Sequence, residues 1–156
     1  MAIFIPGMKC IICNQAIVQG QEKKSFPPFV SNKYDPIYVF SDAICHLECY
    51  CGHPLAEKAQ IRFNEFKEKT NPSKRVCSIC NQQIINPDDY LGLGHLTDDA
   101  MNALYEYNYK QYHSSCLKKW PGLPNLYSLL NQFQESEKWG GAGLKVLLKS
   151  INILCE

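Results

Sequence analysis

The chain reads Cys10-Ile11-Ile12-Cys13-Asn14-Gln15, and Cys77-Ser78-Ile79-Cys80-Asn81-Gln82 follows 67 residues later. Each stretch holds a Cys-x2-Cys pair, and each pair is followed after 32 residues by a His-x2-Cys pair. Three thiolates and one imidazole in two close pairs form the donor set of a tetrahedral structural zinc site. The spacing therefore predicts two Zn2+ ions. The predicted ligands are Cys10, Cys13, His46 and Cys49 in the first set and Cys77, Cys80, His113 and Cys116 in the second.

The duplication extends well beyond the ligands. Identical residues recur at the same offset along both halves of the chain: Asn14 and Asn81, Ile17 and Ile84, Tyr38 and Tyr105, Pro54 and Pro121, and Phe66 and Phe133. A repeat of this length indicates two copies of one small structural unit. We therefore expect a first zinc module over residues 1–72, a second over 73–139, and a C-terminal amphipathic helix over 140–156.

Composition indicates how such small modules are stabilised. A unit of about 70 residues buries little apolar surface, and bound metal commonly supplies the missing stability. The nine cysteines are an odd count and a histidine joins each cluster, which favours metal binding over a secreted disulfide framework. Residues 1–6 are apolar but too short for a signal peptide or a membrane span. We therefore expect a cytoplasmic protein with reduced cysteines and no membrane association.

The segments between the ligands predict an α+β fold. In the first module Cys10–Asn14 is expected to form a knuckle turn, with short strands at 17–18 and at 38–40. Ser41 and Asp42 offer N-caps to a helical turn that carries the last two ligands. A knuckle, a β-hairpin and a helix are thus expected in each module.

Helices are expected over 55–69 and 123–133, and the second hairpin over 101–109. The C-terminal stretch repeats large apolar residues at helical spacing, namely Leu144, Leu147, Leu148, Ile151 and Leu154. This stripe indicates either a core helix on the preceding module or a detachable partner-binding helix. Cys155 is interpreted as a core residue of the same helix.

The order knuckle, hairpin and ligand-bearing helix resembles that of treble-clef zinc fingers. The segment Tyr112-His113-Ser114-Ser115-Cys116-Leu117 is similar to the centre of a LIM-type finger. The resemblance implies two tandem treble-clef-like modules whose Cys and His pairs hold zinc. A LIM domain has a second four-ligand site directly after the first, and this chain has none at that spacing, so no LIM partner is implied.

The chain contains further cysteines and histidines besides the predicted ligands. Cys45 could replace His46, which leaves a Cys-x3-Cys pair, although the duplicated pattern favours His46. Cys45 and Cys51 could form a redox switch, but the simpler interpretation is two small packed or partly exposed thiols. His53 and His95 are interpreted as packing or surface histidines.

A catalytic role is not expected. Catalytic zinc keeps an open coordination position, whereas each predicted site already has four protein ligands. Treble-clef scaffolds also occur in HNH-type nucleases, which need a general-base histidine on the hairpin. Ile37–Phe40 and Leu104–Tyr107 contain no histidine. An HNH-like metal-dependent nuclease is the alternative enzyme.

Charge argues against nucleic acid as the partner. The formal net charge is +1; six zinc-bound thiolates would subtract six charges and two Zn2+ ions would add four, which gives −1. The best basic clusters are Lys67, Lys69, Lys74 and Arg75, and the pair Lys23 and Lys24. Lysines interleaved with glutamates usually form a solvated helix face, so a nucleic-acid-binding regulator is kept as an alternative.

The segment 86–109 points to a protein partner. It has no lysine or arginine and combines acidic residues with tyrosines, a composition that suits docking to a basic protein. The predicted partner-binding residues are Asp88, Asp89, Tyr90, Asp98, Asp99, Tyr105, Glu106 and Tyr107. The alternative interpretation is that the tyrosines pack and the aspartates cap turns.

These features together predict a non-catalytic, zinc-binding protein-interaction molecule. Small size, an acidic aromatic segment and missing catalytic motifs are loosely similar to bacterial immunity proteins, which cover the active site of a toxin. That resemblance implies a toxin domain with a basic surface as the partner. Adjacent toxin genes or a co-purifying basic protein would distinguish it from the nucleic-acid alternative.

Overall fold

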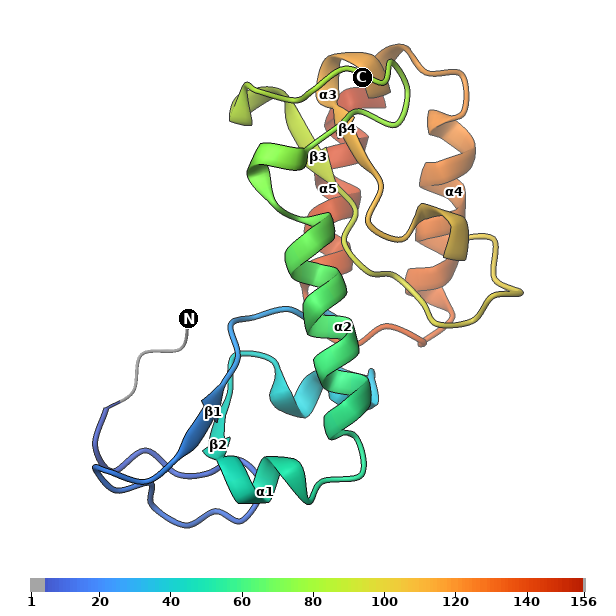
Figure 1. The fold of residues 1–156 in the computed structure, drawn as a ribbon. Coiled ribbons are helices and arrows are strands. Elements are labelled where there is room, and N and C mark those ends of the chain that lie inside the picture. The colour runs from blue at the N-terminus through green and yellow to red at the C-terminus, as the bar shows by residue number, and fades with distance from the viewer. Residues whose placement is uncertain (1–4, 156) are drawn as a thin grey trace. The chain divides into compact units, whose positions relative to one another are not determined.

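The computed structural model describes residues 5–155, except for the side chain of Cys155 (Figure 1). The expectation that Cys155 is a core residue lies outside these described side chains. The chain divides into two compact units, residues 1–65 and residues 66–156. The boundary falls within a helix, seven residues before the predicted module boundary at residue 72.

The first unit holds a two-stranded antiparallel sheet and a short helix. Strand β1 (Lys23–Ser25) pairs with β2 (Ile44–His46), and α1 (Leu47–Cys51) follows directly. Helix α2 (Ala56–Lys69) begins in this unit, close to the predicted start, and ends in the second. The fold is therefore α+β, as predicted.

The strands predicted at 17–18 and 38–40 are wrong. Residues Pro36–Phe40 form the 3-10 helix η1, because Pro36 stands in its first turn and the Asp35 carboxylate accepts a hydrogen bond from the Ile37 N–H. The region of Ile17 contributes only the isolated bridge between Lys9 and Ala16. Ser41 and Asp42 do not N-cap α1, since β2 separates them from it. Ser41 is instead the C-cap of η1, and its backbone N–H donates to Tyr38 O.

The second unit repeats this plan and adds two long helices. Strand β3 (Tyr90–Gly92) pairs with β4 (Gln111–His113), and α3 (Ser114–Lys119) follows. Helices α4 (Leu123–Glu135) and α5 (Gly143–Cys155) complete the unit. Short 3-10 helices lie at Pro72–Lys74 (η2), Pro87–Asp89 (η3) and Tyr105–Tyr107 (η4). The hairpin predicted over 101–109 is wrong, because its strands flank this segment instead.

The two units share one strand register. His46 pairs with Lys23 in the first sheet, and His113 pairs with Tyr90, the residue 67 positions later, in the second. The backbone turns into β2 and β4 also match, with positive φ angles of 54° at Asp42 and 58° at Tyr109. The sequence duplication is thus a duplication of structure.

A side chain ties the loop before the second strand in each unit. Ser41 Oγ accepts hydrogen bonds from the N–H groups of Phe29 and Val30, both at 3.0 Å. In the second unit Asn108 Oδ1 accepts from the N–H groups of Leu96 and Thr97, at 2.7 and 3.1 Å. Different side chains at equivalent positions therefore hold the same loop.

Each unit has its own core. Phe26 anchors the first, with the rings of Phe29, Phe40, Tyr50 and Phe63 at centroid distances between 5.2 and 6.0 Å. Leucines dominate the second core, and α5 contributes Leu144, Leu148 and Ile151 to it while packing against α3 and α4. Of the two roles weighed for the last helix, the structure shows the packed one. None of the described helices has the length and apolar character needed to cross a membrane.

Candidate metal centres

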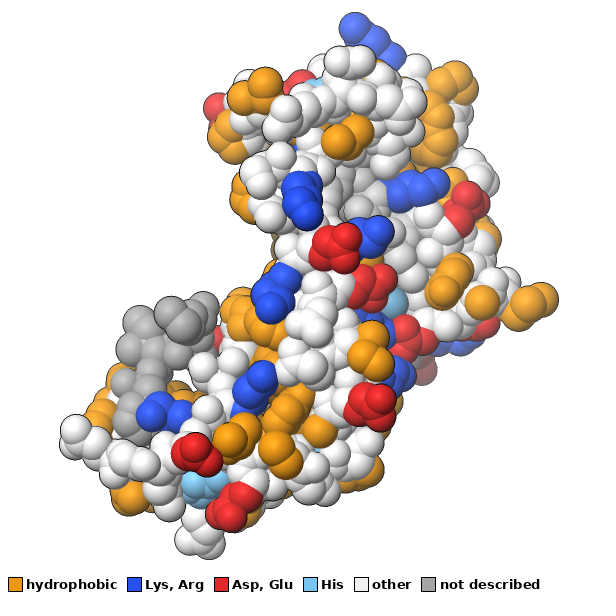
Figure 2. All heavy atoms as spheres, viewed as in Figure 1, with side chains coloured by type: hydrophobic (Ala, Val, Ile, Leu, Met, Phe, Trp, Pro, Cys, Tyr) orange, Lys and Arg blue, Asp and Glu red, His pale blue; other side chains and the backbone are white. Residues whose placement is uncertain are grey.

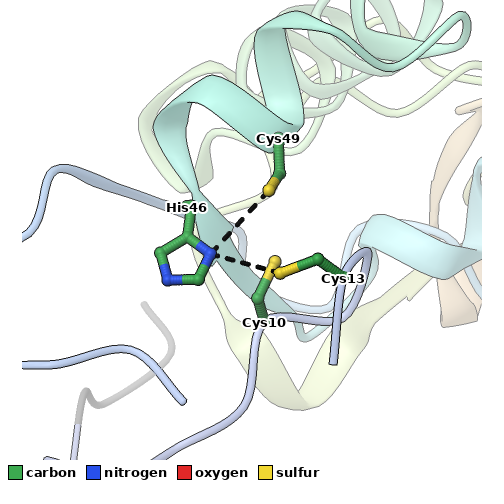
Figure 3. A group of neighbouring side chains, drawn as sticks. All are labelled: Cys10, Cys13, His46 and Cys49. Carbon is green, nitrogen blue, oxygen red and sulfur yellow. Dashed lines mark hydrogen bonds between the residues drawn. The ribbon is translucent and has the colours of Figure 1, made fainter. Parts of the chain in front are cut away.

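The first cluster draws its donors from three elements. Cys10 and Cys13 lie on the knuckle, His46 ends β2, and Cys49 lies in α1 (Figure 3). His46 Nδ1 lies 3.4 Å from Cys13 Sγ and 3.8 Å from Cys49 Sγ. All four donor atoms lie within 4.8 Å of one another, so this cluster could hold a metal ion.

The second cluster has the same geometry. His113 Nδ1 lies 3.4 Å from Cys80 Sγ and 3.8 Å from Cys116 Sγ, and Cys77 completes the group within the same 4.8 Å limit. The eight cysteines with described side chains are all free thiols. The structure therefore brings together all eight predicted ligands in two separate Cys3His groups.

Backbone hydrogen bonds shape each knuckle around its first two cysteines. In the first, Cys10 N–H donates to Gln15 O and Asn14 N–H donates to Cys10 O, both at 2.8 Å. Asn14 turns the chain with a φ of 61°, a left-handed conformation that asparagine tolerates better than most residues. Cys77, Asn81 and Gln82 repeat these bonds at 2.9 Å, with φ at 57°. The repeated asparagine thus has a conformational cause.

Each knuckle is also fixed to the second strand of its sheet. Ile11 N–H donates to Ile44 O at 3.1 Å, and Ser78 N–H donates to Gln111 O at 2.8 Å. These bonds hold the first two cysteines beside the histidine that ends the strand. The donor geometry is therefore built into the backbone.

The surroundings of the first cysteine in each cluster favour its thiolate form. Burial alone would raise the pKa of Cys10, but N–H groups of Cys13, His46 and Ile12 donate to its sulfur and lower the pKa to about 6. For Cys77, burial is again outweighed by backbone donors, and the pKa falls to about 6. Such N–H donors stabilise a charged sulfur whether or not it also binds a cation.

The last cysteine of each cluster has a raised pKa instead. Partial burial and the neighbouring sulfurs of Cys13 and Cys10 raise the pKa of Cys49 to about 12. The same two causes, with Cys80 and Cys77 as neighbours, raise the pKa of Cys116 to about 11. Several thiolates in one small space repel one another, so full ionisation requires a cation among them.

An outer contact fixes the ring of His46. Its Nε2 lies 3.2 Å from Gln21 Oε1, which also accepts a hydrogen bond from Val18 N–H at 2.8 Å. Because that oxygen is only an acceptor, Nε2 carries the proton and Nδ1 presents its lone pair to the three sulfurs. Gln21 was not among the predicted site residues, because nothing in its spacing along the sequence marks it.

The other cysteines and histidines take ordinary roles. Cys45 is buried, its Sγ lies 3.6 Å from Lys24 O, and burial raises its pKa to about 11. It lies outside the cluster, so His46 rather than Cys45 completes the donor set. Cys51 is exposed. His53 accepts a hydrogen bond from Leu55 N–H and packs on Phe40, as expected for a packing histidine.

The residues predicted to bind a partner separate into two groups. Tyr107 is 8% exposed, Tyr90 lies beneath the Arg75 guanidinium at 3.9 Å, and both carboxylate oxygens of Asp89 accept hydrogen bonds from Ser115. These three side chains serve the fold. The exposed ones are Asp88, Asp98, Asp99, Tyr105 and Glu106.

Met101 is an exposed residue that the sequence analysis did not select. Its relative exposure of 94% is the highest among the large apolar side chains that the structure describes. The sequence feature that could have identified Met101 is a large apolar residue among aspartates and small or polar residues. Burial, which decides whether such a residue is an anchor or a core position, is not visible in the sequence.

No family model, no curated protein sequence and no solved structure matches this chain. The assignment of the two metal centres is therefore based on the residues of this chain alone.

Proposed function

We propose that this chain is a non-catalytic protein-binding molecule whose two treble-clef-like modules are each stabilised by one Zn2+ ion. The spacing of the donor atoms carries the zinc assignment. A Zn–S bond of about 2.3 Å and a Zn–N bond of about 2.0 Å at a tetrahedral angle separate S and N by roughly 3.5 Å. The S–N distances of 3.4 and 3.8 Å in both clusters bracket this value.

The donor count favours a structural role for the metal. Four protein donors saturate a tetrahedral ion and leave no position for a reactive water, whereas catalytic zinc sites keep one open. The histidines of β2 and β4 are His46 and His113, which belong to the clusters and cannot also act as a general base. This supports a binding role over the HNH-like nuclease.

We place the partner surface on the acidic loop, defined as residues 97–106. Hydrogen bonds within the loop hold its backbone. Thr97 Oγ1 accepts from Asp99 N–H at 3.1 Å, Asp99 Oδ1 accepts from Met101 N–H at 3.0 Å, and Asn102 Oδ1 accepts from Leu104 N–H at 2.9 Å. A loop that is already ordered loses less entropy when it binds.

The side chains of the acidic loop suit a basic protein surface. Met101 at 94% and Tyr105 at 47% exposure supply apolar contact area. Asp98, Asp99 and Glu106 add negative charge around them, which steers a positive partner toward the loop. A cytoplasmic toxin domain that this protein occludes would be a partner of this chemistry.

Nucleic acid fits the surface less well. On the face drawn in Figure 2, basic and acidic side chains alternate rather than gather by sign. A phosphate backbone needs a continuous basic face, because charge neutralisation supplies much of the affinity. The acidic loop would repel it.

Affinity capture from the source cell tests the proposal. The bait is the zinc-loaded chain, and the loop variant carries Asp98→Lys and Asp99→Lys. A matched control carries Glu135→Lys and Glu137→Lys, which makes the same charge change at exposed positions outside the loop. We expect a basic protein that the wild type and the control retain and the loop variant loses. Equal retention by all three, or salt-sensitive retention of RNA or DNA, would contradict the proposal.

A further inference from the structure

A pocket of about 260 Å³ lies beside the second knuckle. Its wall includes Lys69 at the end of α2, Lys74 in η2, Val76 and Ser78 around Cys77, and Gln111 at the start of β4. Pockets for drug-sized ligands usually span about 300–1,000 Å³. This one suits a short chain end rather than a cofactor.

Gln111 brings a buried polar side chain to this pocket, and the buried Tyr109 hydroxyl is a second polar group among its lining residues. The Gln111 side chain is 8% exposed, and its Nε2 donates to the backbone carbonyl of Lys69. That bond orients the amide, so Oε1 is left as an acceptor. Oε1 is buried and accepts no hydrogen bond from any residue that the structure describes. A buried acceptor without a donor is rare in folded proteins, and its lone pairs are available to a ligand atom that carries N–H or O–H.

The charges around the pocket indicate an anionic ligand with one negative charge. Lys69 and Lys74 are exposed at its wall, and Glu68 is the one acidic side chain among its lining residues. Two positive charges and one negative charge leave one positive charge to be matched. A carboxylate matches it, whereas a phosphate dianion would exceed it. The C-terminal end of α2 carries partial negative charge, which disfavours a nearby anion. The Gln111 Nε2–H group donates to the Lys69 carbonyl and so offsets part of this charge.

We propose that this pocket binds the C-terminus of a peptide chain. The α-carboxylate pairs with Lys69 and Lys74, and the last peptide N–H donates to Gln111 Oε1. Val76 contacts the terminal side chain. Capture of a terminal carboxylate is an established mode of peptide recognition, and the adjacent N–H and carboxylate of a chain end match the acceptor and the cations here. The inference is independent of the acidic loop and of its partner.

The test is an NMR titration of the zinc-loaded, 15N-labelled full chain. The probe is an N-acetylated tripeptide that ends in valine with a free carboxylate, and its matched control is the same peptide with a C-terminal amide. We expect the free acid to shift the Gln111 side-chain amide and the Ser78 N–H, with a Kd of about 1 mM. The amide should bind at least about tenfold more weakly, since it lacks the charge that the lysines recognise.

Variants at the rim keep the test independent of folding. Lys69→Gln with Lys74→Gln should weaken the free acid about as much as amidation does, while Lys118→Gln with Lys119→Gln, exposed lysines outside the pocket, should leave it unchanged. Equal binding of acid and amide, no shift at about 10 mM peptide, or no effect of the rim variants would overturn the proposal. Tighter binding of AMP to the same resonances would identify a nucleotide site instead.

Discussion

The carboxylate of Asp89 accepts two hydrogen bonds from Ser115, one from the backbone N–H and one from the hydroxyl, both at 2.8 Å. These donors, the backbone N–H first, hold the pKa of Asp89 below its usual value. Ser115 lies in the first turn of α3 and directly precedes Cys116, so Asp89 caps the helix that presents the last donor of the second cluster. In the first module the equivalent of Ser115 is Glu48, which has no hydroxyl to donate.

Asp89→Ala is therefore expected to lower the Tm of the second module by a few degrees and to speed loss of its zinc to a chelator. Asp88→Ala is the matched control, because Asp88 is exposed and its carboxylate makes no hydrogen bond in the described structure. Differential scanning calorimetry and zinc release to a colorimetric chelator measure the two effects. If both variants behave alike, the cap has no role in holding the cluster.

Asn81→Ala tests whether asparagine recurs at positions 14 and 81 because it tolerates the left-handed backbone conformation found there. At a φ of 57° an alanine costs about 1 kcal/mol more than asparagine or glycine, so the variant should lose about that much stability. Asn81→Gly should stay within about 0.5 kcal/mol of the wild type. Chemical denaturation gives both values. Equal losses for alanine and glycine would show that the asparagine side chain matters instead.

Gly122→Ala tests the contact between Gly122 and the ring of Trp120. A Cβ at position 122 would overlap that ring, which stacks on buried Tyr112 with centroids 6.3 Å apart. Moving Trp120 should cost about 1–3 kcal/mol. Gly52→Ala is the control, because its φ is −81° and its Cβ would meet only an ordinary contact. A neutral Gly122→Ala variant, measured by the same denaturation, would mean that the ring moves freely.

Alkylation under native conditions should distinguish Cys45 from Cys51, two of the three cysteines outside the clusters. Cys51 is exposed and should react with N-ethylmaleimide within minutes, whereas Cys45 is buried with a raised pKa and should stay unmodified. Peptide mapping by mass spectrometry identifies the labelled residue. Rapid labelling of Cys45 in the zinc-loaded protein would show that its core opens, and would revive the redox switch considered from the sequence.

Cys80→Ser and His113→Ala should each unfold the second module while the first keeps its structure, since each ion stabilises its own unit. Resolved 15N NMR spectra distinguish the two modules. The converse variant, Cys13→Ser, should reverse the pattern. Equal loss of structure in both modules from one substitution would mean that the units fold as one.

The two Cys3His groups and the long helices could be predicted from the sequence, because both follow from spacing. The ligands need only recur in pairs, and α2, α4 and α5 show apolar periodicity over 13 or 14 residues. The strands were missed because each has three residues, and Lys23–Ser25 shows no apolar alternation. Tyr38 and its neighbours favour a strand by composition, but the Asp35 cap and Pro36 impose a 3-10 turn.

The partner surface was predicted only in part for a similar reason. Tyr105 and Tyr107 lie two residues apart in one acidic segment, yet Tyr107 is buried and Tyr105 is 47% exposed. From composition alone, both tyrosines are predicted to be aromatic anchors. Only the path of η4 decides which of them faces solvent.

Native mass spectrometry of gently purified protein tests the central claim most directly, because it counts bound metal and detects disulfides at once. The two Cys3His groups predict a chain that carries two zinc ions with all of its cysteines reduced, and a Cys80→Ser variant that carries one. A chain without zinc, or a mass that shows these sulfurs bonded to one another, would contradict the account.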